Sequence, residues 1–155
     1  MNYFVYSHLY FSYFCFRGYR DTSDQYRITD LIGDYRARCL FSKVWALREA
    51  AVLKVKLMLS EEFQASPGIS ACLAPVSCVV RVAVEDKIAQ VFFSSIALLD
   101  DLVIASNRAR ISKDAFAPII SPVVINLMEK LADGGQRIRD AARKVLTHYL
   151  RLLLP

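Results

Sequence analysis

The sequence has few cysteines, histidines, glycines and prolines, and their scarcity excludes several classes of protein. None of the four cysteines among the 155 residues lies in a Cys-x-x-Cys pair: Cys15, Cys39, Cys72 and Cys78. Only two histidines could assist them, so the pattern of a zinc site is missing. The cysteines are also too sparse for the disulfide framework of a small secreted domain, and a reducing, intracellular compartment is expected.

The sequence also contains none of the short motifs that mark phosphate-binding loops, dinucleotide-binding folds, serine hydrolases or zinc proteases. Two pairs of adjacent acids, Glu61-Glu62 and Asp100-Asp101, point in different directions on a helix or loop, which favours solvated surface over a catalytic dyad. His148 falls on the polar face of an expected helix. We therefore expect no enzyme, no catalytic residue, no cofactor and no metal site.

Apolar residues, by contrast, are abundant. They make up 55% of the chain, and the mean hydropathy is +0.29, which is high for one soluble domain of this length. Either a large core buries them or part of the apolar surface is covered by something else. The net charge of +5, with a pI near 9.1, favours acidic partners but does not choose among nucleic acid, anionic lipid and protein.

The first sixteen residues are uncharged and rich in Tyr and Phe. They lack the basic start of a signal peptide, and they are shorter than the roughly 20 residues that span a bilayer. Three interpretations stay open: an extension foreign to the domain, a short packed element, or a membrane anchor. Residues 17–29 are polar and predict a linker. The chain thus divides into an aromatic extension with its linker, residues 1–29, and a helical domain, residues 30–155.

Within that domain apolar residues recur at helical spacing, and no alternating run indicates a strand. Asp30, Ser42 and Asp86 are expected helix caps. Pro75 is expected to shorten or kink its helix, and Gly134-Gly135 separates the last two helices. The expected helices are residues 30–41, 45–60, 69–84, 86–106, 116–132 and 136–154.

These helices pair into repeats. Residues 47–51 (LREAA) and 138–142 (IRDAA) share the pattern apolar-Arg-acid-Ala-Ala, and residues 88–92 (IAQVF) take the same place in the middle pair. Spacings of about 40 and 50 residues bracket the period of HEAT and armadillo repeats. We expect an all-α fold, an α-solenoid of about three HEAT-like helix pairs. Residues 47–51 are interpreted as packing between helices. Arg48 and Arg139 are structural, and each can reach an acid that ends the previous helix, such as Asp133.

The short turns inside the helix pairs lie along one edge of such a solenoid. The first turn contributes Lys43 and Trp45, the second contributes Lys87, and the third contributes Gln136 and Arg137. Basic residues around a partly exposed aromatic suit an acidic protein surface. In the alternative interpretation Trp45 packs between repeats and the charges only solvate the turns, and the residues alone do not decide between the two.

Three segments together resemble the TOG-domain class of HEAT arrays: residues 42–51 (SKVWALREAA), 86–92 (DKIAQVF) and 131–142 (LADGGQRIRDAA). From about residue 30 to 154 the chain most resembles the TOG domain of the centrosomal, ciliary-tip protein family. The resemblance implies binding of tubulin through the edge of turns, with Trp45 as the apolar contact and Lys87 and Arg137 facing acidic tubulin surface. Lys43 and Gln136 complete the expected site. It also implies a place at the centrosome, basal body or cilium.

The sequence departs from the TOG pattern in two ways. A full TOG domain has more HEAT repeats than the three helix pairs here, so the chain resembles its N-terminal half and is expected to expose an apolar flank on the last helix. The second turn also lacks the Arg-acid pair of the other two.

Other functions remain as alternatives. They are a generic HEAT scaffold with an internal Trp45, a membrane-associated protein that uses residues 1–16, and a nucleic-acid binder that uses the basic residues of the last helix. That helix has no aromatic interleaved with its basic residues, so neither nucleic acid nor, apart from the aromatic N-terminus, a membrane is expected as a partner.

Overall fold

The computed structural model describes residues 22–61 and 68–153 of the 155-residue chain, and this part is built of helices without a strand. The all-α prediction is therefore confirmed. The elements, in chain order, are α2 (Thr22–Leu40), α3 (Trp45–Glu61), α4 (Ile69–Val84), α5 (Ala89–Arg108), α6 (Lys113–Glu129), the 3-10 helix η1 (Lys130–Ala132) and α7 (Gln136–Leu153).

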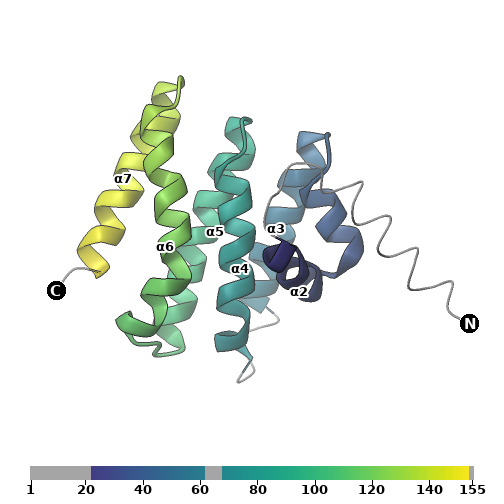
Figure 1. Cartoon of the computed structure of the whole chain (residues 1–155), viewed down its shortest axis with the longest axis vertical. Coiled ribbons are helices and arrows are strands. Elements are labelled where there is room, and N and C mark those ends of the chain that lie inside the picture. The colour runs from purple at the N-terminus through teal and green to yellow at the C-terminus, as the bar shows by residue number, and fades with distance from the viewer. Residues whose placement is uncertain (1–21, 62–67, 154–155) are drawn as a thin grey trace, which may run out of the picture.

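The helices form pairs that stack side by side into a solenoid, as predicted. The pairs are α2 with α3, α4 with α5, and α6 with α7 (Figure 1). Consecutive pairs join through contacts of α2 with α4, α3 with α5, and α4 with α6. The turns inside the pairs lie at one end of the molecule, whereas the turn between α5 and α6 lies at the opposite end (Figure 1).

Helix α2 begins at Thr22, eight residues before the predicted start, so the polar segment expected to be a linker is helical from Thr22 onward. Asp30 lies inside this helix and does not cap it. The polar residues hide an apolar pair, Ile28 and Ile32, which is spaced by one helical turn and is fully buried. Gly33 kinks the helix with φ of 77° and ψ of 158°, a conformation that strongly favours glycine.

Pro75 does not shorten its helix, because α4 runs through it from Ile69 to Val84. The carbonyl that Pro75 leaves without a donor belongs to Ala71, an exposed residue that water can reach. Asp86 does not cap α5, because this helix begins three residues later at Ala89. Ser42 was expected to cap α3, but its hydroxyl accepts a hydrogen bond from the backbone N–H of Val44, which precedes the helix. Helix α6 begins at Lys113, where the hydroxyl of Ser112 caps it.

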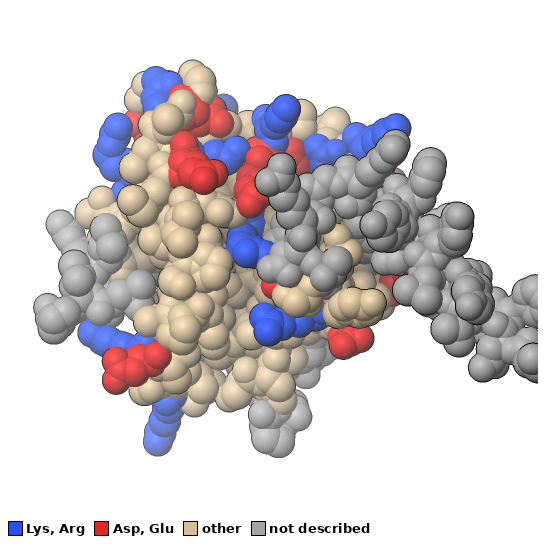
Figure 2. All heavy atoms as spheres, viewed as in Figure 1, with Lys and Arg blue, Asp and Glu red and all other residues tan. Residues whose placement is uncertain are grey.

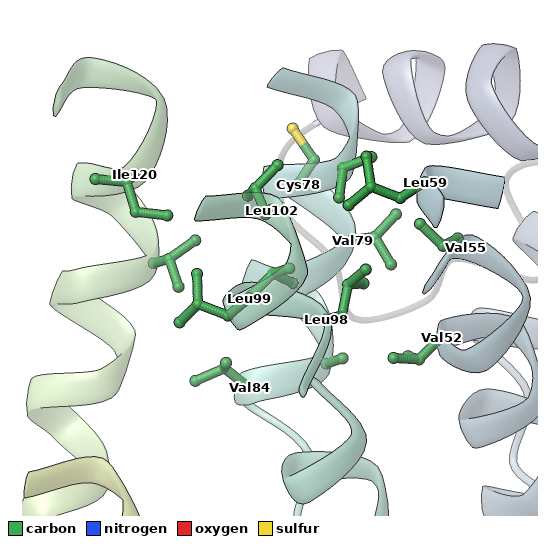
Figure 3. Close-up of a cluster of buried hydrophobic side chains, with 14 of the residues drawn as sticks. Val52, Val55, Leu59, Cys78, Val79, Val84, Leu98, Leu99, Leu102 and Ile120 are labelled. Atoms are coloured by element: carbon green, nitrogen blue, oxygen red, sulfur yellow. The ribbon is translucent and has the colours of Figure 1, made fainter. Parts of the chain in front are cut away.

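One continuous core runs through the repeats and accounts for much of the apolar composition (Figure 3). Two helices of the described segments are long and apolar enough to cross a bilayer by length and composition, α5 and Lys113–Ala132. Helix α5 is mostly buried, between α3 and α4. The residues drawn from α3, α4, α5 and α6 in this core include Val52, Val55, Leu59, Val79, Leu98, Leu99, Leu102 and Ile120.

The expected apolar flank of the last helix was wrong for the described side chains. Helix α7 buries its apolar stripe, including Ala142 and Tyr149, and exposes polar residues such as Lys144 and Thr147. The most exposed apolar residues of this repeat belong to α6, where Ile125 and Met128 are each 58% exposed. Helix α7 exposes few apolar residues because its apolar residues lie on one face, and that face packs against α5 and α6.

Candidate protein-binding edge at the intra-repeat turns

Each of the three intra-repeat turns starts with the same local hydrogen bond. A short polar side chain accepts from the backbone N–H two residues later: Ser42 Oγ from Val44 at 3.1 Å, Asp86 Oδ1 from Ile88 at 2.9 Å, and Asp133 Oδ1 from Gly135 at 2.8 Å. Ser and Asp make this bond readily because their side chains are short. The three turns are therefore built alike, although their sequences differ.

An arginine holds the backbone of the first and third turns. Arg48 Nη1 donates to the carbonyl oxygens of Ser42 at 2.8 Å and Lys43 at 3.2 Å. Arg139 Nη1 donates to the carbonyl oxygens of Asp133 at 2.7 Å and Gly134 at 2.9 Å. Both arginines thus hold the backbone of their own turns, and Arg139, which was expected to reach the acid of Asp133, donates to the carbonyl oxygen of that residue.

The second turn obtains its cation from the next repeat. Phe92 stands where an arginine would be and is fully buried. Lys130, from η1, donates instead to the carbonyl oxygens of Asp86 at 2.9 Å and Glu85 at 3.3 Å. Its ammonium lies 5.8 Å from the centroid of the Phe92 ring, within reach of a cation–π interaction. The role of Lys130 could not be predicted from the sequence, because it lies 44 residues from Asp86, whose carbonyl oxygen it binds.

This geometry corrects the predicted alignment of the middle repeat. The second helices of the pairs begin at Trp45, Ala89 and Gln136, spacings of 44 and 47 residues (45 to 89 and 89 to 136). Residues 91–95 (VFFSS), not 88–92, therefore correspond to LREAA and IRDAA. Burial agrees, since the equivalent positions Ala51, Ser95 and Ala142 are 3%, 0% and 0% exposed.

An ion pair joins the first two turns. Arg48 Nε lies 2.5 Å from Asp86 Oδ2, and Arg48 Nη2 lies 3.0 Å from Asp86 Oδ1. The two side chains are only 19% and 9% exposed. Burial alone would raise the pKa of Asp86, but hydrogen bonds from Arg48 and the Ile88 N–H, with the charges of Arg48 and Lys130, lower it below its usual value. The hydrogen bond with Asp86 raises the pKa of Arg48, against the opposing effect of burial.

Two of the predicted basic residues present free ammonium groups on this frame. Lys43 and Lys87 are exposed, and neither ammonium has an ion-pair partner among the described residues. Trp45 is 45% exposed, so it is not buried in the core between the repeats. Lys and Arg side chains appear along the upper edge of the molecule, between acidic side chains (Figure 2).

The predicted residues of the third turn are exposed but engaged with neighbours. Gln136 Nε2 donates to Asp140 Oδ1 at 2.8 Å, and Gln136 Oε1 accepts from Arg139. The guanidinium of Arg137 lies 5.5 Å from the centroid of the Phe93 ring. Arg137 thus leans toward the second repeat, which brings its charge nearer to that part of the edge.

Three further apolar residues of the edge were missed or misinterpreted from the sequence. Val44 is 54% exposed, Ile88 is 38% exposed, and Leu47, expected to pack between helices, is 41% exposed. The sequence contained a pattern that could have identified Val44 and Ile88 as turn residues. Each lies two residues after the polar residue, Ser42 or Asp86, that starts its turn. The first two turns thus combine apolar side chains with lysines.

Comparison with known proteins identifies the family. Residues 24–150 match the family described as the TOG domain of the centrosomal protein CEP104. The chain belongs to this TOG-domain family. The resemblance seen in the sequence is therefore confirmed, and the solenoid is a TOG-type HEAT domain.

Two solved structures share the fold. They are described as the structure of the TOG domain of human Cep104, with a TM-score of 0.74, and as the CEP104 TOG domain, with a TM-score of 0.75. Each is 22% identical, and each match covers 81% of this chain and 50% of the other. The chain thus spans half the length of these TOG structures. No curated protein matches the chain.

Proposed function

We propose that this TOG-type domain binds tubulin through the edge of intra-repeat turns, as part of a cytoskeletal protein at the centrosome, basal body or cilium. One observation carries the proposal: an exposed Trp45 follows the exposed Lys43 by two residues in the first turn, on the same array of turns as the exposed Lys87. An aromatic anchor surrounded by basic side chains is suited to an acidic protein surface.

The proposed mechanism is binding without chemistry. Trp45, with the exposed Val44 and Ile88, supplies apolar area, while Lys43, Lys87 and Arg137 supply the charge that selects an acidic partner. The turns are already held by Arg48, Lys130 and Arg139, so binding orders little backbone. In this proposal Gln136 stabilises the third turn through its hydrogen bonds with Arg139 and Asp140, and the neighbouring Arg137 contacts the partner.

Co-migration with purified tubulin on a sizing column tests the proposal. The wild-type chain should co-migrate with tubulin, and Trp45→Ala and Lys87→Glu should each reduce the bound fraction strongly. The matched controls are Tyr35→Ala, which removes an aromatic that is 73% exposed on α2, and Lys144→Glu, which makes the same charge change on α7. If both edge variants bind as well as the wild type, the edge is not the tubulin site.

A second candidate is an interaction scaffold for a different acidic protein surface. It is favoured by the third turn, where Gln136 bonds to Asp140 and the guanidinium of Arg137 lies near the ring of Phe93, so that these two predicted contacts are already engaged within the domain. In that case the wild-type chain would fail to co-migrate with tubulin while circular dichroism shows it to be folded and helical.

A further inference from the structure

An apolar pocket lies at the end of the molecule opposite the intra-repeat turns. It has a volume of about 100 Å³ and sits beside the turn between α5 and α6, residues 109–112. Its apolar walls come from Val103 of α5, Ile111 of the turn, and Phe116 and Ile120 of α6. We call it the far-end pocket, and Figure 1 shows its turn at the lower end of α6.

The polar groups in the wall of the far-end pocket are already bonded inside the protein. Ser106 Oγ donates to the carbonyl oxygen of Val103 at 2.9 Å, and Tyr149 Oη donates to Asp100 Oδ1 at 2.8 Å. These two hydroxyls therefore leave mostly carbon surface to a ligand, and the other polar side chains of the lining, Asn107 and Lys113, are exposed to solvent. Its volume corresponds to about three water-sized volumes of roughly 30 Å³ each, so the pocket has room for a single small apolar side chain.

The segment that borders the pocket is basic, and we call it the rim: Lys113 lines the pocket, and Arg108 and Arg110 are the sequence neighbours of the lining residues Asn107 and Ile111. All three are exposed, and none has an ion-pair partner among the described residues. Asp114 is the one acid between residues 108 and 114, so this short segment carries a charge of +2. A cationic rim around an apolar pocket is complementary to a peptide with carboxylates on both sides of an aliphatic residue.

The backbone of the turn gives a second, independent observation. Arg110 N donates to the carbonyl of Asn107 at 3.0 Å, and Ile111 N donates to the carbonyl of Ser106 at 3.1 Å. This is the Schellman end of a helix, in which glycine usually takes the left-handed position. Here Arg110 takes it, with φ of 55°, the one non-glycine residue with positive φ in the described ranges. The chain thus keeps a cation at the rim where glycine would be more stable.

We propose that the far-end pocket binds an acidic peptide segment of a partner protein, with one branched aliphatic side chain in the pocket and flanking carboxylates on Arg108, Arg110 and Lys113. The site is separate from the edge of intra-repeat turns and does not depend on tubulin binding. It gives this domain a second docking surface, built where the second and third helix pairs meet.

Titration of the ¹⁵N-labelled whole chain with two synthetic peptides tests the site. One is acetyl-Glu-Glu-Leu-Glu-Glu-amide, and in the other serine replaces leucine. The leucine peptide should shift the amide signals of Val103, Ile111 and Phe116 and bind about tenfold more tightly than the serine peptide, because only leucine buries apolar surface. Equal affinity for both peptides, or shifts elsewhere only, would overturn the proposal.

The variant Arg110→Gly separates binding from folding. It should raise the melting temperature, since glycine adopts the left-handed conformation freely, and it should weaken binding of the leucine peptide by about threefold to tenfold through loss of a cation. Lys87→Ala removes one positive charge at the opposite end and should bind the peptide like the wild type. Unchanged peptide binding by Arg110→Gly would contradict a role for the rim.

Discussion

At the scale of single residues, the position of Trp45 distinguishes the two interpretations that the sequence left open. As the one tryptophan of the chain it could have filled the core, but 45% of its surface is exposed at the start of α3. The exposure arises because Trp45 is the first helical residue after a turn whose backbone is fixed by Ser42 and Arg48. The exposed part of Trp45 is therefore accessible to a partner.

Fluorescence of the free protein checks this placement. We expect emission from Trp45 at the long wavelength of a hydrated indole, with ready quenching by iodide. Because Lys43 is close in sequence and exposed, iodide should quench more strongly than caesium at the same concentration. Emission at short wavelength, protected from both ions, would contradict the exposed position.

The carboxylate of Asp86 makes the stability of the domain sensitive to acid. Its pKa is lowered in the folded state, so its contribution to the free energy of unfolding is present above the unfolded pKa of about 4 and is lost as pH falls through the folded pKa. Asp86→Asn should lower the free energy of unfolding by about 2 kcal/mol at neutral pH.

Urea unfolding at several pH values measures this effect. The difference between wild type and Asp86→Asn should shrink as the pH falls well below about 4. The exposed Asp114→Asn serves as the control and should have little effect at either pH. A difference that stays constant with pH would show that the charge of Asp86 does not carry the stabilisation.

At the scale of elements, the helices with clear apolar periodicity were predicted well. The predicted bounds of α3, α4 and α7 agree with the structure to within one residue. The start of α2 was missed because its polar residues hide the buried pair Ile28 and Ile32, and its kink depends on the positive φ of Gly33. The alignment of α5 was missed because its arginine position holds Phe92, and the replacing cation lies in another helix pair.

Lys130 ties the third helix pair to the second. Replacing it with methionine keeps the length of the side chain but leaves the carbonyls of Glu85 and Asp86 without this donor. We expect Lys130→Met to lower the free energy of unfolding by about 1–2 kcal/mol. Chemical denaturation measures the change, with Lys144→Met on the exposed face of α7 as the matched control. Equal stability of the two variants would show that Lys130 is dispensable.

At the scale of the whole molecule, the solenoid could be predicted because a repeat period and a helical period occur together in the sequence. The edge could be predicted only in outline. Its members Lys43, Trp45 and Lys87 are exposed, but the engagement of Gln136 with Asp140 and Arg139 has no signal in composition. The ion pair of Arg48 with Asp86 joins residues 38 apart, a distance over which pattern alone selects no partner.

The excess of positive charge gives the proposed tubulin interaction a dependence on salt. With a net charge of +5 and two exposed lysines on the edge, association should weaken as salt rises from about 50 to 200 mM, because screening shortens the reach of exposed charges. Lys87→Glu should reduce this salt dependence as well as the affinity. Sedimentation with tubulin at several salt concentrations measures both, and affinity that is insensitive to salt would contradict electrostatic selection.

Lys130, which completes the second turn, also determines the order in which the turns can form during synthesis of the chain. A chain leaves the ribosome with its N-terminus first, yet the turn that carries Lys87 waits for a donor 44 residues beyond Asp86. The first turn, whose arginine lies six residues from its carbonyl, needs no such delay. The middle of the edge is thus finished only after η1 has been synthesised and has docked, so a nascent chain presents the Trp45 end of the edge before the complete array exists.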